Sequence, residues 1–443
     1  MKPIQKVHLI SLGCAKNLVD SENMLGILKG KGAALASTLE EADIAIVNTC
    51  GFIRSAVEEA LDTILQVAAE KKRGKLKRLF VAGCLVQRYG YKLRKEIPEV
   101  DGWIGTGEIH RVGRLLDRER NVEKHVDIGS PAFLADHTTP RVLSTPFYTA
   151  YLKIAEGCSH KCTYCIIPKL RGPFRSRSID SLVREAEWMA KQGVKEINLV
   201  AQDTTMYGKD LATGATLEGL LEKLLKVEGL RWIRVLYSHP SRISERLLDL
   251  MDQVEALCPY LDIPFQHVNP RILLAMGRNE GENPWKLIER VRAKKRRISL
   301  RTTLMVGFPG ETEKAFKELY QFVKEAEFDH LGAFAFSPEK GAPAARLHKK
   351  VRPERAQERL DAIMRLQRRI SRKKNLAMVG KTTVALLEGE SPETDLLLSG
   401  RTAGMAPEVD GRVLINKGMG KIGEMVSVLI TDAQPYDLIG EIL

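Results

Sequence analysis

The sequence predicts an α/β protein built from three parts. Strand-like and helix-like runs alternate over the first hundred or so residues, which is typical of an open parallel sheet covered by helices. A second series of about six such units follows a proline-containing stretch and indicates a partial (β/α) barrel. The last part, residues 377–443, consists of short β-rich pieces separated by Gly, Pro and Asp, which favours a small antiparallel β-barrel.

The N-terminal part, residues 1–125, contains three apolar runs that each end at a cysteine. The runs "KVHLISLGC", "EADIAIVNTC" and "LKRLFVAGC" end at Cys14, Cys50 and Cys84. Because crossover helices make such strands parallel, all three thiols belong at the carboxyl edge of the sheet, where open α/β sheets bind ligands. Core packing alone rarely puts a cysteine after every strand. The helical segments in between carry candidate N-caps at Ser21 and Ser55.

Residues 126–147 contain three prolines among small and polar residues and are predicted to be a linker. The partial barrel is then expected at 148–376. Barrels of this kind place their chemistry at the carboxyl ends of the strands. Each polar residue there is, on its own, more often a turn residue than a functional one. The strand ends carry Cys158, Gln202 with Asp203, Ser238 with His239, Gln266 with His267, the loop from Gly307 to Glu311, and Ser337.

Charge is distributed unevenly along the chain. The formal net charge is +13, but residues 377–443 hold ten carboxylates against five Lys and Arg, so that part is about −5 and the rest about +18. An acidic C-terminal barrel repels phosphate and suits a basic protein partner. The basic runs "KKRGKLKR", "RAKKRR" and "RLQRRISRKK" are either RNA-facing or simply solvated.

Composition also restricts the compartment. No apolar run approaches the roughly 20 residues that a membrane helix needs, so no membrane partner is expected. The apolar stretch before Cys14 is too short and too charged for an export signal. Seven cysteines, an odd number in a long chain, favour a reducing cytoplasm over a disulfide framework.

The stretch "EGCSHKCTYC" places Cys158, Cys162 and Cys165 on one short loop, a spacing that suits zinc or an iron–sulfur cluster. Zinc would need a fourth ligand, for which His160 is the only local candidate. A ferredoxin-type carrier would supply four cysteines, whereas three leave one iron open for a substrate or cofactor. A zinc-stabilised nucleic-acid-binding module, an iron–sulfur carrier or regulator, and an enzyme all remain possible at this point.

With an aromatic residue before its last cysteine and a place after the first barrel strand, "CSHKCTYC" resembles the radical S-adenosylmethionine (SAM) superfamily. The resemblance implies that Cys158, Cys162 and Cys165 hold a 4Fe-4S cluster whose open iron binds SAM. Reductive cleavage of SAM would give a 5′-deoxyadenosyl radical that abstracts a hydrogen atom. The resemblance also implies cofactor contacts at Tyr164, Gln202, Gly307 and Glu311.

The whole chain is similar to the radical SAM methylthiotransferases, on "SLGCAKNLVDSE", "NTCGFI", "VAGCLVQRY" and a C-terminal barrel similar to a TRAM domain. The resemblance makes 1–125 the methylthiotransferase domain and implies that Cys14, Cys50 and Cys84 hold a second 4Fe-4S cluster for the inserted sulfur. At Ala15 the family more often has proline, but this is not a ligand position. Cys258 matches no motif and is expected to be a buried thiol.

The motifs "LDIPFQH", "RTTLMVGFPGET" and "GRTAGMAPEVDG" resemble one branch of this family. That branch adds a methylthio group to the β-carbon of an aspartate in ribosomal protein uS12. The alternative is the branch that modifies a tRNA adenosine beside the anticodon. The implied partners are uS12, free or within the small ribosomal subunit, and an electron donor such as flavodoxin or ferredoxin, with tRNA as the alternative substrate.

Overall fold

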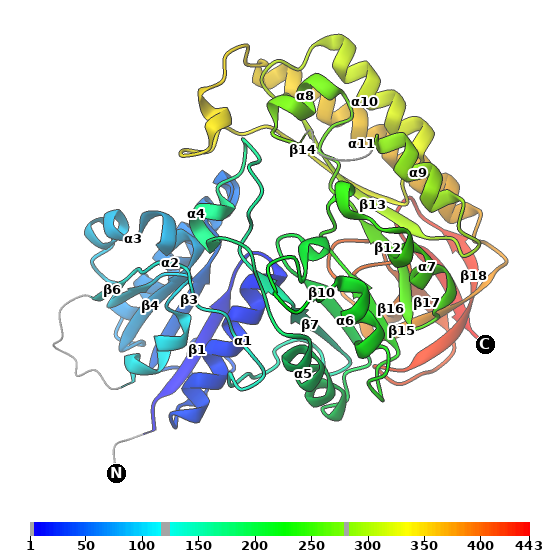
Figure 1. Cartoon of the computed structure of the whole chain (residues 1–443). Helices are drawn as coiled ribbons and strands as arrows, with labels where there is room; N and C mark the ends of the chain where they lie inside the picture. The colour runs from blue at the N-terminus through cyan, green and yellow to red at the C-terminus, as the bar shows by residue number, and fades with distance from the viewer. Residues whose placement is uncertain (1–3, 117–124, 279–282) are drawn as a thin grey trace.

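The computed structural model describes residues 4–116, 125–278 and 283–443. Its sheets form three units, namely an N-terminal parallel sheet, a central parallel sheet and a closed C-terminal barrel. Figure 1 shows the N-terminal unit beside the central sheet and the barrel on the other side of that sheet. The predicted fold class is therefore confirmed.

The N-terminal sheet has six parallel strands in the order β2-β1-β3-β4-β5-β6. The three strands that precede the cysteines are β1 (Lys6–Ser11), β3 (Ile44–Thr49) and β4 (Arg78–Gly83). Sequence periodicity missed the other three because each is only two or three residues long: β2 (Ala34–Leu35), β5 (Gly102–Ile104) and β6 (His125–Asp127). The expected linker start at residue 126 falls inside β6.

Helices cover both faces of this sheet. One core forms under α2 (Arg54–Lys72) and α3 (Cys84–Glu96), and another forms under α1 (Ala15–Gly30) and the 3-10 helix η1 (Ile109–Leu115). The N-cap prediction is wrong, because α1 starts after Cys14 and α2 after Ile53. Apolar spacing reveals the packed face of a helix but not its first turn. Both serines lie inside the helices.

The central sheet has six parallel strands in the order β14-β13-β12-β11-β10-β7 and stays open between β14 and β7. The six strand segments predicted for it are all present. They are β7 (Thr149–Lys153), β10 (Glu196–Val200), β11 (Trp232–Val235), β12 (Leu257–Asp262), β13 (Ser299–Val306) and β14 (His330–Ala335).

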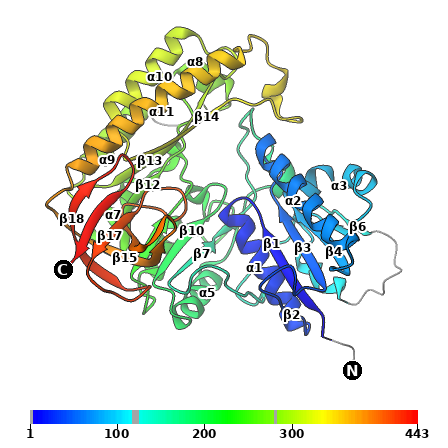
Figure 2. The same ribbon diagram turned by 180° about the vertical axis from the view of Figure 1, so that it is seen from behind.

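Helices cover the outer face of the central sheet and enclose the main apolar core. They are α5 (Ile179–Lys191), α6 (Leu217–Leu224), α7 (Glu245–Gln253), α9 (Pro284–Arg292), α10 (Glu313–Ala326) and α11 (Pro353–Leu376). The short pieces α4 (Ile167–Arg171) and α8 (Pro270–Ala275) and the strand pair β8 (Ala155–Glu156) and β9 (Arg175–Ser176) lie around the carboxyl edge. Seen from behind in Figure 2, α11 runs along the outside toward the barrel.

The C-terminal barrel closes in the order β15-β16-β17-β19-β18. Its strands are β15 (Thr382–Ser391), β16 (Thr394–Thr402), β17 (Val413–Lys417), β18 (Met425–Ala433) and β19 (Leu438–Ile442). It was expected to be antiparallel, but β17 and β19 pair in parallel. A closed ring with an odd number of strands cannot alternate direction throughout, so one parallel pair is unavoidable. Leu386 and Ala406 of this unit pack with Trp232, Cys258 and Tyr260 of the central sheet.

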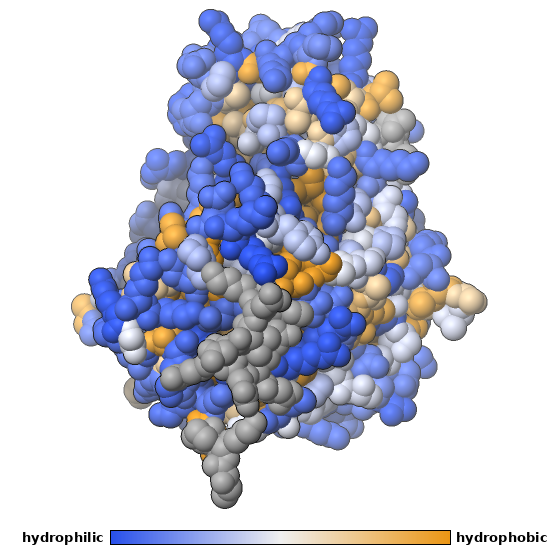
Figure 3. Space-filling model, turned by 90° about the vertical axis from the view of Figure 1, so that its left-hand side faces the viewer, coloured by the Kyte–Doolittle hydropathy of each residue, from blue (hydrophilic) through white to orange (hydrophobic). Residues whose placement is uncertain are grey.

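Figure 3 views the N-terminal side, where the surface is mainly hydrophilic and hydrophobic side chains form small separate patches. In the described part of the chain, no helix combines the length and the apolarity needed to cross a membrane.

Candidate active site

The first three predicted ligands converge at the carboxyl edge of the N-terminal sheet. Cys14 precedes α1, Cys50 follows β3, and Cys84 opens α3 directly after β4. Close approach of the loops depends on Gly13, whose φ is +89° and where an added Cβ would lie 2.7 Å from the Cβ of Cys50. Any side chain at this position would therefore push the first two cysteine loops apart.

These three thiols differ in electrostatic environment. Cys14 is exposed. Desolvation raises the pKa of its thiol, but the charges of Lys16 and Arg171 and nearby backbone N–H groups lower it by more, so the net shift is downward. Burial raises the pKa of Cys50. Burial also raises the pKa of Cys84 to about 12, although the Nε of Arg171 donates to its Sγ at 3.3 Å.

The second set of predicted ligands, Cys158, Cys162 and Cys165, lies on the loop after β8. The backbone N–H of Cys158 donates to the carbonyl of Gly172 at 3.0 Å, and that of Thr163 donates to the carbonyl of Met276 at 2.9 Å. The loop is thus fixed to α4 on one side and to the end of α8 on the other.

Arg278 is a further residue of this loop site, and no sequence motif marked it. Its guanidinium donates to the carbonyl of Pro264 at 2.8 Å and contacts the Tyr164 hydroxyl at 3.4 Å. Burial raises the pKa of Cys158 to about 11 and that of Cys165 to about 12, and the positive charge of Arg278 only partly offsets this effect.

His160, the candidate fourth zinc ligand, is bound elsewhere. Its Nε2 lies 2.6 Å from an Asp203 oxygen, and its ring stacks on that of His239 with centroids 4.4 Å apart. Burial, with the nearby charge of Arg278, lowers the pKa of His239 to about 3. Within residues 4–116, 125–278 and 283–443, no three His, Cys, Asp or Glu side chains gather closely enough to bind one metal ion.

Unpartnered polar atoms follow three neighbouring central strands. Gln202 after β10, Ser238 after β11 and Gln266 after β12 each bury a side-chain oxygen that has no hydrogen-bond partner within the described chain. Leaving such a group unpaired costs about 1–3 kcal/mol. Gln266 and Tyr237 also adopt φ of +66° and +60°, a strained conformation that is concentrated at functional sites. This edge is therefore suited to a polar ligand.

The remaining predicted cofactor contacts have partners inside the protein. Glu311 is fully buried, accepts a hydrogen bond from the backbone of Gly307 and pairs with Arg359 of α11 at 2.9 Å. A Cβ on Gly307 would lie 2.5 Å from that of Ala356, so this loop packs directly against α11. Tyr164 packs in an apolar cluster beside the cysteine loop. Whether these residues also contact SAM stays a prediction.

A buried charge network connects the two sets of cysteines. Asp20 of α1 pairs with both Lys153 and Arg171, and Lys153 also pairs with Glu156 at 2.7 Å. Gln202 donates to the other oxygen of Glu156 at 3.1 Å. Burial raises the pKa of Glu156, but the two cations lower it more, to about 2. Sequence reasoning missed this network because Asp20 and its partners are far apart in the chain.

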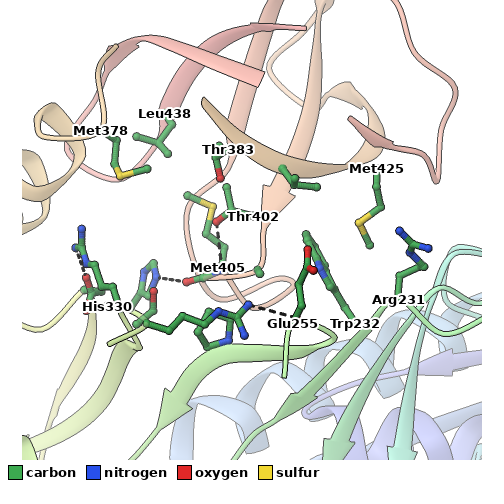
Figure 4. Close-up of a pocket in the computed structure, with 18 of the residues that line it drawn as sticks. Arg231, Trp232, Glu255, His330, Met378, Thr383, Thr402, Met405, Met425 and Leu438 are labelled. Carbon is green, nitrogen blue, oxygen red and sulfur yellow. Dashed lines mark hydrogen bonds and ion pairs between the residues drawn. The ribbon is translucent and has the colours of Figure 1, made fainter. Parts of the chain in front are cut away.

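A cavity of about 670 Å³ lies at the opposite end of the central sheet, between the amino ends of the strands and the C-terminal barrel (Figure 4). Trp232, Met405 and Met425 line it, and the Nε2 of His330 donates to the carbonyl of Gly404 at 2.8 Å. Because none of the six predicted ligand cysteines lines this cavity, it is separate from the candidate site.

Comparison with known proteins identifies the family. The ribosomal protein uS12 methylthiotransferase RimO of Geotalea uraniireducens is 48% identical over 441 residues, which covers 99% of this chain and 98% of the relative. The chain belongs to the RimO family. RimO of Clostridioides difficile is 46% identical over 440 residues, covering 99% of each chain.

Family models agree with the RimO assignment. They match residues 6–105 (uncharacterized protein family UPF0004), 152–323 (radical SAM superfamily) and 379–443 (TRAM domain). The radical SAM methyltransferase TsrM of Kitasatospora setae, solved with cobalamin and a 4Fe-4S cluster, has a TM-score of 0.55 at 15% identity and covers 75% of each chain. The cobalamin-dependent enzyme OxsB has a TM-score of 0.52 at 15% identity, covering 82% of this chain and 56% of its own. At this identity the two structures support the fold alone.

Proposed function

We propose that this member of the RimO family is a radical SAM methylthiotransferase that adds a methylthio group to the β-carbon of an aspartate in ribosomal protein uS12. The observation that carries the proposal is the identity of nearly half over the full length of curated uS12 methylthiotransferases. The placement of two cysteine trios at two sheet edges, joined by a buried charge network, supports it.

The donor set at the second trio fits a 4Fe-4S cluster. Its three thiols would bind three different irons, so they need not lie as close together as the ligands of one ion. The bound cluster and SAM would supply a 5′-deoxyadenosyl radical that removes a hydrogen atom from the substrate carbon. The protein's part is to hold the loop through Gly172 and Met276.

Cys14, Cys50 and Cys84 would hold the second 4Fe-4S cluster. Three thiols from three strand ends again leave one position without a protein ligand, as a reactive site requires. The unpartnered oxygens of Gln202, Ser238 and Gln266 would meet polar groups of SAM, since all three lie at the carboxyl ends of central strands, the edge that also carries the cysteine loop. We expect Tyr164 to lie beside the cluster or the adenine, and Gly307 and Glu311 to support this edge.

The acidic C-terminal barrel supports uS12 rather than tRNA as the partner. Ribosomal proteins are typically basic, and a surface of opposite charge chiefly raises association rate and specificity. The electron for the reductive cleavage of SAM would come from a donor such as flavodoxin or ferredoxin. All seven cysteines are free, which fits a reducing cytoplasm.

Iron content and product analysis test the assignment of the two clusters. Replacing Cys158, Cys162 and Cys165 by alanine should leave about half the iron and abolish SAM cleavage. Replacing Cys14, Cys50 and Cys84 should preserve cleavage to 5′-deoxyadenosine but abolish the methylthio product. Loss of all iron from the first variant would contradict two independent sites.

Mass spectrometry of cells that lack the gene tests the substrate. We expect uS12 to lose a methylthio group, while the methylthio content of bulk tRNA stays unchanged. The reverse result would assign the enzyme to the tRNA branch.

A further inference from the structure

The structure distinguishes the three basic runs of the sequence by what their charges contact. In the first run, residues 71–78, the side chains are engaged with acidic or backbone partners. The pairs are Lys71 with Asp101, Lys72 with Glu99, Arg73 and Lys75 with Glu70, and Lys77 with Asp43, and Arg78 donates to the carbonyl of Leu115.

The second run, around residues 290–297, is engaged in the same way. Arg290 and Lys294 pair with Glu245 of α7, and Arg297 pairs with Asp329 at 2.8 Å. Arg292 and Arg296 donate to backbone carbonyls. Most cations of these two runs are therefore already paired and have little uncompensated charge to offer to a partner.

The third run, in the second half of α11, is different. Arg365, Arg368, Arg369 and Arg372 are exposed, and their three- and four-residue spacing puts them on one face of the helix. Among the described residues, Arg365, Arg368 and Arg372 have no hydrogen-bond or ion-pair partner, and Arg369 only contacts the Tyr320 hydroxyl at 3.4 Å. From Arg365 to Leu376 the helix contains no acidic residue.

The neighbouring helix α10 extends this charge. Lys314, Lys317 and Lys324 are exposed on one stripe of α10 and have no partner in the part of the chain described. The two helices run parallel and touch at both ends, through Glu313 with Arg355 and through Lys373 with Glu327. Figures 1 and 2 both show them side by side on the outside of the central sheet.

Within the described chain, the acidic residues of α10 and α11 form no ion pairs with the exposed lysines and arginines described above. In α11 they precede the arginines, at Glu354, Glu358 and Asp361. In α10, Glu313 pairs with Arg355, Glu318 accepts a hydrogen bond from Asn269 at 2.6 Å, and Glu325 accepts one from Gln321. We call the four arginines and three lysines the α10/α11 basic face.

We propose that the α10/α11 basic face binds the phosphate backbone of structured RNA, namely the ribosomal RNA that surrounds the substrate protein in the small subunit. This inference rests on the proposed function. Phosphate contacts require cations that are free to displace counterions, and this face supplies them. Guanidinium groups can also bind phosphate oxygens in pairs.

The division of charge over the molecule supports an RNA partner for this face. The C-terminal barrel is acidic and repels phosphate, whereas the arginines of the α10/α11 basic face lie on α11, the helix that leads into that barrel. A basic protein and the RNA around it could then contact adjacent surfaces of opposite charge. Contacts of this kind position a partner without reading its sequence.

The test compares two full-length variants with the same change in charge. The first carries R365Q, R368Q, R369Q and R372Q; the control carries K72Q, R73Q, K75Q and K77Q, at exposed positions of the first run. The probe is a labelled hairpin from small-subunit ribosomal RNA, titrated at several salt concentrations. We expect the first variant to bind at least about tenfold more weakly and its salt slope to fall by about 3, as loss of four phosphate contacts requires. The control should stay within about twofold of the unmodified protein.

Activity on free uS12 separates this inference from the proposed function. The first variant should methylthiolate free uS12 at the rate of the unmodified protein but modify assembled small subunits several-fold more slowly. Equal weakening of RNA binding by both variants would overturn the inference, as would binding to phosphatidylglycerol vesicles in preference to the RNA hairpin. Failure of the unmodified protein to act on any form of uS12 would instead count against the proposed function.

Discussion

Arg171 shows how one side chain can serve both halves of the site. It comes from α4, just after the cysteine loop of the central unit, and it reaches Cys84, Asn17 and Asp20 of the N-terminal unit. All of these contacts are buried. A buried charge with several partners is expensive to disturb, because removing one partner leaves the others desolvated and unpaired.

We therefore predict that Arg171→Met lowers the free energy of unfolding by about 3–5 kcal/mol. The double variant that also carries Asp20→Asn should lose less stability than the sum of the losses of the two single variants, because the two residues share one network. Urea denaturation of the single and double variants measures this coupling. Arg184→Met, which removes an exposed ion pair with Asp180, is the control and should cost under about 1 kcal/mol. Strict additivity of the Arg171 and Asp20 variants would contradict the network.

Cys258 provides a second residue-scale prediction. It is fully buried between the central sheet and the C-terminal barrel, and burial raises its pKa to about 11, so it remains a neutral thiol. Cys258→Ala should leave iron content and SAM cleavage unchanged and cost about 1 kcal/mol of stability through lost packing. A loss of iron, measured after anaerobic purification, would identify it as a ligand.

At the scale of elements, the site depends on loops that are fixed by contacts from other units. The cysteine loop after β8 packs against the turn that ends α8, where Gly277 has φ +70°. A Cβ on Gly277 would lie 2.6 Å from the carbonyl oxygen of Lys161 in the cysteine loop. The turn therefore requires glycine both for its conformation and for the close approach.

Gly277→Ala is expected to displace the cysteine loop and to reduce the iron content by up to about half, since only one of the two proposed clusters depends on this loop. SAM cleavage should fall with it. Gly214→Ala is a matched control, because Gly214 has φ +66° but no atom within 4 Å of an added Cβ. If the control lost as much iron as Gly277→Ala, backbone strain rather than the contact would be responsible.

At the scale of the whole molecule, a buried ion-pair cluster holds the C-terminal barrel against the central sheet. Arg401 of β16 pairs with Glu196 of β10 at 2.6 Å, and Arg234 of β11 pairs with the same carboxylate at 3.0 Å. Asp410 likewise accepts a hydrogen bond from Tyr260 at 2.6 Å. The barrel thus packs against the central sheet through buried contacts and is not attached only through the end of α11.

The docking of the barrel should be pH-dependent through Glu196. Burial raises the pKa of this carboxyl, but the two arginines lower it more, from 4.5 to about 2. A carboxyl whose pKa is lowered in the folded state stabilises the fold. This stability is fully present above the ordinary pKa of 4.5 and is lost as the pH falls toward 2. The contribution is about 3 kcal/mol.

Thermal unfolding of Glu196→Gln across this range tests the pH effect. At neutral pH the variant should be less stable by about 3–5 kcal/mol, because two buried arginines lose their charged partner. The difference should shrink as the pH falls from about 4.5 toward 2, because in this range the carboxyl of the unfolded chain takes up a proton while the native carboxylate does not. A difference that is constant with pH would show that Glu196 does not carry this dependence.

Much of the fold could be predicted from local patterns. The six central strands and the three N-terminal strands before the cysteines are long apolar runs with turn signals, and the structure contains all of them. The short strands β2, β5 and β6 were missed because two or three residues leave no periodic pattern, and their pairing comes from neighbouring strands. The parallel pair in the barrel follows from ring closure, which acts only on the assembled sheet.

The sequence by itself located the candidate ligands, because thiols on a short loop and after successive parallel strands stand out without any knowledge of long-range contacts. The choice of an iron–sulfur cluster over zinc came from the family resemblance and not from the spacing alone. Only the tertiary structure decided which charges are free. Arg171, Arg278 and Lys71 meet partners far away in the chain, so their engagement cannot be derived from spacing. The arginines on the second half of α11 remained exposed because no acidic element packs against them. The sequence therefore determines which side chains carry charges and thiols. Long-range packing decides which of these groups are paired within the protein and which are exposed to a partner.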